Sequence, residues 1–213
     1  KISYLFVDGR YTIQAKQQSG NQFKIVEIHK FLPKNILGNL KLGFDPSLFT
    51  KRTLNLNFNK SQQLITIKKN LVDEIYKNRK PKREKFYSLP GMVVGESYKS
   101  KVNRVHKILK LKKADYLFIS SPENVAWLMN IRGYDNPTSP IPNCRLLINK
   151  DKKIFLISDK KVTSKIIKEK KFEKSQIIIP EKFEELVSRL NGNKFIIDSS
   201  SCSILNENII KSK

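Results

Sequence analysis

The run Ile119–Asp135 constrains the fold of this chain more than any other part of the sequence. An apolar strand pattern ends there, and Ser121–Pro122 predicts the cap and first turn of a helix. The helix that follows is apolar, so Trp127, the only tryptophan, is predicted to belong to the core. Arg132–Asp135 then predicts a tight turn that displays a cation and a carboxylate at one corner.

The rest of the sequence alternates strand patterns with helix patterns, which is typical of α/β domains. Strands are predicted at residues 3–7, 23–28, 41–44, 63–67, 114–120, 144–148, 153–157, 176–179 and 194–198. Helices are predicted at residues 11–18, 47–55, 71–78, 98–109, 122–130, 162–168, 180–190 and 204–210. We therefore expect two tandem α/β units, each a mixed β-sheet covered by helices.

A loss of periodicity between the two halves of the sequence marks the expected domain boundary. Residues 80–91 combine several basic side chains with two prolines and a glycine. We place the first domain at residues 1–79, a linker at 80–96 and the second domain at 97–213.

The predicted helix after Ser97 is amphipathic. Its apolar stripe consists of Tyr98, Val102, Val105, Ile108 and Leu109. The side chains expected to face solvent are Lys99, Lys101, Arg104, His106 and Lys107. In the predicted helix over 71–78, the inward residues are Leu71, Val72 and Ile75.

The net charge is +23, with 42 Lys and Arg against 19 Asp and Glu. Such an excess often accompanies nucleic-acid or membrane binding. Here it is mostly lysine, spread along the chain together with abundant Ile and Asn, and only residues 77–85 form a dense basic run. No apolar stretch reaches the roughly 20 residues of a membrane helix. We expect no specific nucleic acid and no membrane as partners, and a basic nucleic-acid-binding module is the less favoured alternative.

Motifs of catalysis are missing from the sequence. There is no Gly-rich phosphate loop, no G-x-S-x-G elbow, no C-x-x-C pair and no H-E-x-x-H. Both histidines, His29 and His106, are predicted to be surface residues. Cys144 and Cys202 fit buried thiols in a reducing compartment. We therefore predict no catalytic and no metal-binding residues in this chain.

Five blocks in order resemble the N-terminal region of aminopeptidase P, the X-prolyl aminopeptidase of the pita-bread metallopeptidase (creatinase) superfamily, three-domain type. They are FVDGRYTIQAKQQ (6–18), LGFDP (42–46), NLVDEIYKNR (70–79), GES (95–97) with Lys101 and Arg104, and the run 119–135. Two departures are visible, since Tyr76 stands where Trp is usual and Tyr134 where Ser is usual.

The resemblance implies two non-catalytic creatinase N-terminal-like domains, the first lacking its initial strands. It implies that the two-metal site, usually manganese, lies in a C-terminal pita-bread domain that this chain does not reach. The expected function is to shape the substrate cleft and the subunit contacts of a cytoplasmic, homodimeric enzyme acting on proline-containing peptides. Whether this polypeptide is itself an enzyme stays open, and the alternative is a stand-alone interaction protein descended from a peptidase.

Three residues are candidates for a position at the substrate cleft or at an interface: Arg10, Arg132 and Asp135. Asp8–Arg10 also fits a plain turn, in which Asp8 caps a helix and Arg10 is solvated. For Arg132 and Asp135 the resemblance implies a position where the second domain meets the catalytic domain. A structural role at the corner is the open alternative for both.

Overall fold

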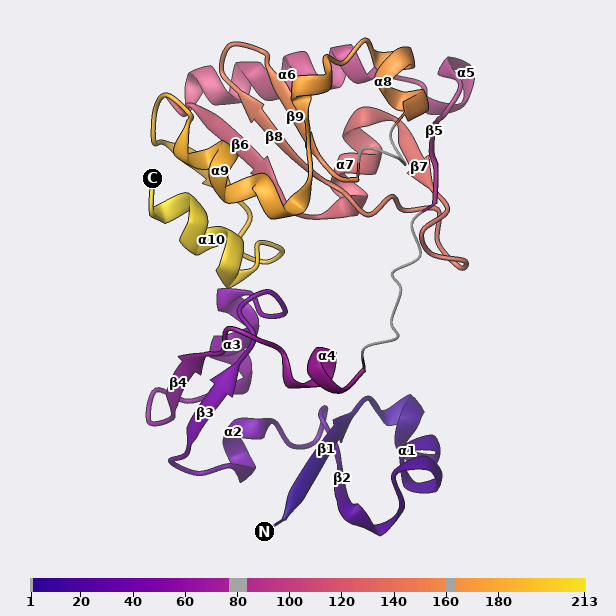
Figure 1. Cartoon of the computed structure of the whole chain (residues 1–213). Coiled ribbons are helices and arrows are strands. Elements are labelled where there is room, and N and C mark those ends of the chain that lie inside the picture. The colour runs from indigo at the N-terminus through magenta and orange to yellow at the C-terminus, as the bar shows by residue number, and fades with distance from the viewer. Residues whose placement is uncertain (1, 77–83, 160–163) are drawn as a thin grey trace. The chain divides into compact units, whose positions relative to one another are not determined.

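A computed structural model describes residues 2–76, 84–159 and 164–213 (Figure 1). Its contacts divide the chain into two compact units, Lys1–Asn70 and Leu71–Lys213. Both units combine helices with strands, so the predicted α/β class is confirmed. The domain limits drawn from the sequence stay a prediction, and most of the basic run 77–85 lies outside the described residues.

The first unit contains two strand pairs, β1 with β2 and β3 with β4, and each pair is parallel. Their elements are β1 (Ser3–Val7), η1 (Gly9–Tyr11), α1 (Thr12–Ser19), η2 (Gly20–Gln22), β2 (Phe23–Glu27), α2 (Pro33–Ile36), β3 (Lys41–Phe44), α3 (Lys51–Asn57) and β4 (Gln63–Thr66). The described strands thus form two separate pairs here, where the sequence pattern predicts one mixed sheet. Helix α3 begins later than predicted because Thr50 caps it, its hydroxyl accepting the N–H of Thr53 at 3.1 Å.

The core of the first unit is small. Val26, Phe44 and Leu54 are its buried apolar side chains. The amide of Gln62 is buried as well and donates to the carbonyl of Gly38 at 2.8 Å, which satisfies a polar group that would otherwise destabilise the core.

The second unit is built on a mixed five-stranded sheet of order β10-β9-β8-β6-β11. Its strands are β6 (Tyr116–Ile119), β8 (Arg145–Asn149), β9 (Ile154–Ile157), β10 (Ile177–Ile178) and β11 (Phe195–Ile197). The antiparallel pairs are β6–β8 and β8–β9, which confirms the predicted hairpin, and the outer pairs β6–β11 and β9–β10 are parallel.

Helices cover both faces of this sheet (Figure 1). They are α6 (Tyr98–Leu111), α7 (Pro122–Met129) and α8 (Ser164–Lys170) on one face, and α9 (Phe183–Ser188) and α10 (Ile204–Lys211) on the other. The second unit therefore has two cores, one between the sheet and α6, α7 and α8, and one between the sheet and α9 and α10. Strand β8 contributes to both, because Leu146 packs into the α6 core and Leu147 packs into the α9 core. Cys144 and Cys202 are buried and free, one in each core, as predicted.

Part of the predicted linker belongs to the second unit. Phe86–Ser88 forms β5, which pairs antiparallel with β7 (Ile131–Gly133). Phe86 is 1% exposed and lies in the core that α6, α7 and α8 cover, so burial of its ring holds this segment against the second unit. The predicted turn over 132–135 is therefore wrong for its first half, which is strand.

Gly133 is needed in β7 for close packing. A β-carbon at this position would lie 2.8 Å from the Cα atom of Pro142 and 3.2 Å from the ring of Phe86. A larger residue would push the strand away from the loop that covers it.

The remaining elements are α4 (Leu71–Ile75), α5 (Gly91–Val94), η3 (Lys174–Gln176) and η4 (Pro180–Lys182). Leu71, Val72 and Ile75 are exposed, against the prediction, because α4 buries none of its residues against the described parts of the chain. Among the described helices, none is both long and apolar enough to cross a membrane.

Candidate functional site

The C-terminal end of α7 is held by a buried lysine from α6. Lys101 is 4% exposed, and its Nζ atom donates to the carbonyl of Trp127 at 2.8 Å and to Oδ1 of Asn130 at 2.7 Å. Asn130 has left-handed backbone (φ 52°), and its side-chain amide donates to the carbonyl of Glu96 at 2.9 Å. The predicted outward orientation of Lys101 is wrong, because its ammonium group donates to one carbonyl at the helix end and to one buried side-chain amide oxygen.

Burial is the main cause that lowers the pKa of Lys101. The nearby Glu96 opposes this shift, whereas Arg104 and Arg132 add to it. Three cations thus surround the end of α7 with one carboxylate among them.

Trp127 lies on the surface of this cluster. The residue is 53% exposed, so the predicted core position is wrong. The Nζ atom of Lys101 lies 4.3 Å from its ring centroid, and the guanidinium carbon of Arg104 lies 5.7 Å from it. Arg104 is also paired with Glu96 at 2.7 Å, which fixes its orientation. We call Lys101, Arg104, Trp127 and Arg132 the Trp127 patch.

Arg132 is half-buried rather than solvated in a turn. Its Nη1 atom donates to the carbonyls of Ala126 at 3.2 Å and Ile131 at 2.8 Å. A cation at a helix C-terminus is favourable because the carbonyls there carry partial negative charge. Within this unit Arg132 therefore has a structural role next to any role at an interface.

Asp135 joins two loops by its carboxylate. Oδ1 accepts the backbone N–H of Glu84 at 3.0 Å, and Oδ2 accepts that of Asn143 at 2.7 Å. Next to it, Tyr134 stacks on Tyr87 with ring centroids 4.9 Å apart. Arg132 and Asp135 are thus close in sequence, but their described hydrogen bonds hold different parts of the backbone.

Arg10, the third candidate, lies in the first unit. Asp8 accepts its backbone N–H at 3.0 Å and its Nε at 2.9 Å, and Nε2 of His29 lies 3.1 Å from the same carboxylate. These partners, above all the Arg10 side chain, hold the pKa of Asp8 well below its usual range. The predicted cap at Asp8 and the surface position of His29 are confirmed, and the side chain of Arg10 is 80% exposed.

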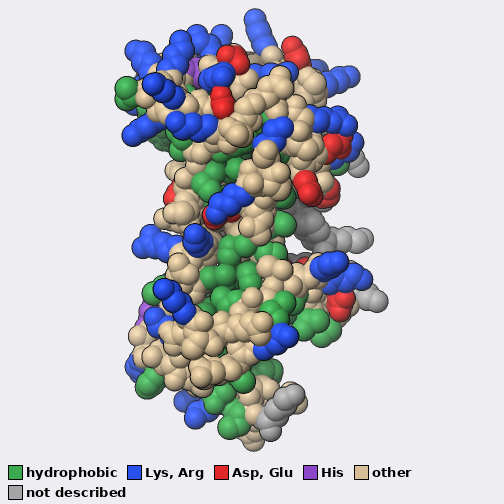
Figure 2. All heavy atoms as spheres, turned by 90° about the vertical axis from the view of Figure 1, so that its left-hand side faces the viewer, with side chains coloured by type: hydrophobic (Ala, Val, Ile, Leu, Met, Phe, Trp, Pro, Cys, Tyr) green, Lys and Arg blue, Asp and Glu red, His purple; other side chains and the backbone are tan. Residues whose placement is uncertain are grey.

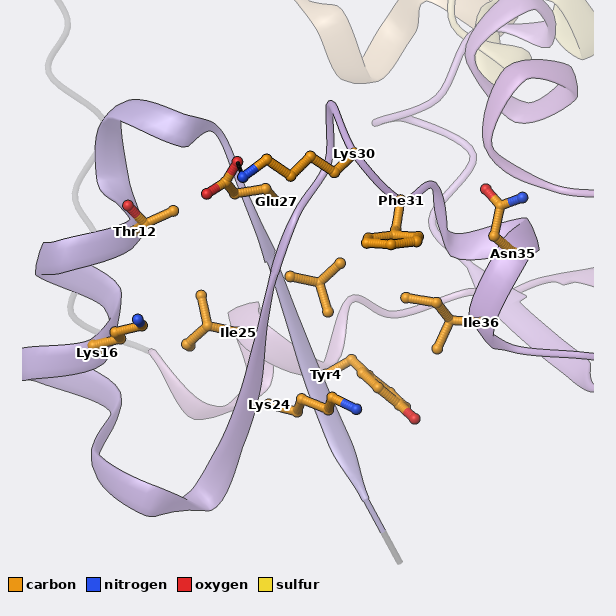
Figure 3. Close-up of a pocket in the computed structure, with 11 residues that line it drawn as sticks. Tyr4, Thr12, Lys16, Lys24, Ile25, Glu27, Lys30, Phe31, Asn35 and Ile36 are labelled. Carbon is orange, nitrogen blue, oxygen red and sulfur yellow. Dashed lines mark ion pairs between the residues drawn. The ribbon is translucent and has the colours of Figure 1, made fainter.

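The first unit also has a pocket of about 530 Å³ beside β2 (Figure 3). Its wall is formed by Tyr4, Thr12, Lys16, Lys24, Ile25, Val26, Glu27, Lys30, Phe31, Asn35 and Ile36. The carboxylate Glu27 pairs with Lys30 at 2.9 Å, and the hydroxyl of Thr12 donates to the carbonyl of Gly9. Glu27, Lys30 and Thr12 are thus engaged locally, and no described pair of polar groups in the pocket has the geometry of a nucleophile with its base.

In the part of the chain that the structure describes, no three His, Cys, Asp or Glu side chains are grouped so that they could hold a metal ion. The described residues therefore would not hold a manganese pair of the kind that the resemblance implies for the C-terminal domain. Asp8, Asp45 and Asp135 each bind neighbouring backbone or side-chain donors instead.

The helical period of α6 contains a signal for the buried lysine that the sequence analysis above does not use. At about 100° per residue, Lys101 lies about 40° from Val105, and His106 lies about 40° from Val102. Both side chains therefore border the apolar stripe, and both are 4% exposed in the structure. The predicted surface position of His106 is wrong for this reason, whereas Ile108, further around the helix, is 53% exposed.

The match to a known protein family lies in the second unit. A family model described as the creatinase/prolidase N-terminal domain matches residues 77–213. The chain belongs to the creatinase/prolidase N-terminal domain family.

Similar proteins have names that agree with this family. The chain is 29% identical over 174 residues to a probable Xaa-Pro aminopeptidase P of Coprinopsis cinerea, covering 75% of this chain and 28% of that protein. It is 30% identical over 180 residues to a probable Xaa-Pro aminopeptidase P of Neosartorya fischeri, covering 76% and 27%. The chain thus spans little more than a quarter of these relatives.

A solved structure extends the likeness to most of both units. The X-prolyl aminopeptidase of Caenorhabditis elegans, described as a cytosolic enzyme with a di-nuclear active site, matches with a TM-score of 0.69 at 26% identity. The match covers 87% of this chain and 32% of that chain.

Proposed function

We propose that this chain is the non-catalytic N-terminal portion of an X-prolyl aminopeptidase, a hydrolase that removes an N-terminal residue preceding proline. The observation that supports this most strongly is the likeness to the Caenorhabditis elegans enzyme over 87% of this chain. Because the described residues group no metal ligands, hydrolysis would depend on a separate pita-bread domain of the same polypeptide, with manganese as its metal.

The chain would serve that domain by shaping the mouth of its substrate cleft and by contributing to contacts in a cytoplasmic homodimer. The Trp127 patch supports this proposal, because it presents a half-exposed indole beside two cations at a helix end that hydrogen bonds hold in place. Trp and Arg are enriched where protein interfaces have their strongest contacts. Arg10, exposed at a fixed turn, and Arg132 and Asp135 are the further candidates.

The test compares this chain alone, the downstream catalytic region alone, and the two expressed as one polypeptide. The substrate is an Xaa-Pro peptide with added Mn²⁺, and the readout is release of the N-terminal residue. We expect no release by this chain alone and the highest kcat/KM for the joined polypeptide. Metal-dependent release by the 213 residues alone would contradict the proposal. A stop codon directly after Lys213 would favour the stand-alone interaction protein.

Nucleic-acid binding is tested by the salt dependence of retention on DNA and RNA. A +23 chain attracts any polyanion, and such attraction weakens steeply with salt. We expect retention that does not depend on base sequence and is lost near physiological salt. Sequence-selective, submicromolar binding at that salt would support the alternative class instead.

A further inference from the structure

A second pocket lies between α6 and the turn that joins β8 to β9, and it is lined by cations. Its volume is about 480 Å³. Arg104, Lys107 and Lys110 reach it from α6, and Lys152 reaches it from the turn. Figure 2 shows Lys and Arg side chains gathered over the end of the second unit that carries α6 in Figure 1.

His106 lines the same pocket and is the unusual member of its wall. It is 4% exposed, and neither Nδ1 nor Nε2 has a hydrogen-bond partner among the described residues. A neutral imidazole carries one donor and one acceptor, and buried polar atoms in proteins are nearly always paired. The ring thus lacks a partner in a wall that otherwise consists of four cations and the neutral side chains of Ser100 and Asn103.

The three lysines of this pocket also lack partners of opposite charge among the described residues. Arg104 is paired with Glu96, but in the described ranges no carboxylate lies within ion-pair distance of Lys107, Lys110 or Lys152. Burial, together with Lys152 and Lys110, lowers the pKa of His106, so the surroundings disfavour a further positive charge. A bound anion would pair with the three lysines and would also accept a hydrogen bond from the imidazole of His106.

The turn that carries Lys152 is fixed before any ligand binds. Oδ1 of Asn149 accepts the backbone N–H of Asp151 at 3.0 Å and that of Lys153 at 2.7 Å. Lys152 therefore projects from a rigid backbone opposite α6, and little ordering of the main chain is needed for binding.

We propose that this pocket binds a small anion with two linked phosphate groups. The lysines pair with the phosphates, and a phosphate oxygen accepts a hydrogen bond from His106. Cations on two opposing elements suit an anion with several charges better than a single carboxylate. The volume also exceeds what one phosphate fills, and it lies in the range of small-molecule sites. Among the described residues of the wall, His106 has the only aromatic ring, which argues against stacking of a nucleic-acid base.

The two histidines of the chain allow a site-specific test by NMR of the imidazole nitrogens. His29, whose side chain is 70% exposed in the first unit, is the internal reference. At near-physiological ionic strength, inorganic pyrophosphate should shift the His106 signals saturably and raise its pKa, with His29 unchanged. A second arm uses phosphatidylcholine vesicles that contain a phosphatidylinositol bisphosphate, and a His106 response confined to this arm would identify a lipid headgroup as the source of the phosphates.

Matched variants separate a built site from general attraction. Lys107→Gln combined with Lys152→Gln should weaken pyrophosphate binding by roughly tenfold or more, since two charge-assisted contacts are lost. Lys99→Gln, an exposed lysine of the same helix outside the pocket, should leave the affinity within about twofold. The proposal is overturned if neither probe moves the His106 signals saturably, or if Lys99→Gln weakens binding as much as the double variant.

Discussion

The Nζ atom of Lys101 lies 2.7 Å from Oδ1 of Asn130, and this buried contact joins α6 to the end of α7. The amide nitrogen of the same asparagine is bound to the carbonyl of Glu96, just before α6. One side chain thus links the beginning of the long helix to the point where β7 leaves α7. The position of Trp127 and Arg132 depends on this link.

Lys101→Met should destabilise the chain by about 2–4 kcal/mol, because a buried amide oxygen and a helix-end carbonyl lose a charged donor. The methionine preserves most of the apolar stem, so the loss reports the ammonium group. Chemical denaturation followed by circular dichroism measures it. Lys99→Met on the exposed side of the same helix is the control and should change stability by less than about 0.5 kcal/mol. Equal effects of the two variants would show that the Lys101 hydrogen bonds contribute nothing.

Asp135→Ala should lower stability by about 1–3 kcal/mol, since it leaves the N–H groups of Glu84 and Asn143 without their acceptor. Asp135→Asn keeps one acceptor oxygen and should lose about half of that. Hydrogen exchange at the amides of residues 84 and 143 is the direct measurement, and both should exchange faster in the alanine variant. Unchanged exchange at both amides would contradict the clamp.

Arg132→Ala should destabilise this chain by about 1–2 kcal/mol, because the carbonyls of Ala126 and Ile131 lose a charged donor. In a full-length enzyme we also expect kcat/KM to fall roughly tenfold or more, the scale of one lost charged contact. The assay must therefore run at a temperature where the variant stays folded. Arg189→Ala, which removes an exposed i,i+4 pair with Glu185, is the control for both measurements. If the Arg132→Ala enzyme is destabilised but has a normal kcat/KM, then Arg132 has a structural role only.

The stability of the chain should fall as the pH drops below about 6.5, and His106 should cause part of this loss. Its pKa is lowered from the ordinary 6.5 by burial and by Lys152 and Lys110. The unfolded chain therefore binds a proton at a higher pH than the folded chain does, so stability rises with pH across that window. The contribution is complete above pH 6.5 and is lost as the pH falls towards the lowered pKa.

The measurement for this prediction compares unfolding free energies of the native chain and of His106→Leu at about pH 7.5 and pH 5.5. The leucine variant should lose less stability between these values, because it has no proton to bind. Carboxylates such as Asp8, whose pKa is lowered in the fold, act in a separate window below about pH 4. An identical pH dependence of the two proteins would contradict the assignment to His106.

Local patterns in the sequence determine most of the secondary structure of this chain. The apolar run before Pro122, the Asn149–Lys152 turn between two apolar segments and Pro180 before an acidic first turn each specify an element that the structure contains. These elements depend on backbone preferences and on the alternation of apolar side chains, which are properties of neighbouring residues. The same segments support the family resemblance, and the family model confirms it.

Tertiary structure alone decides how the candidate side chains are used. Period and polarity show on which side of a helix a residue lies, but not what lies opposite it. Lys101 is buried because the end of α7 offers two oxygen acceptors within reach of its flexible stem. Trp127 is exposed because only one side of α7 packs on the sheet, and Arg132 is in a strand because Phe86 brings β5 beside it. Each outcome depends on packing between segments far apart in sequence. A local pattern can place Lys101 beside the apolar stripe of α6, but it does not identify the partner that lies opposite.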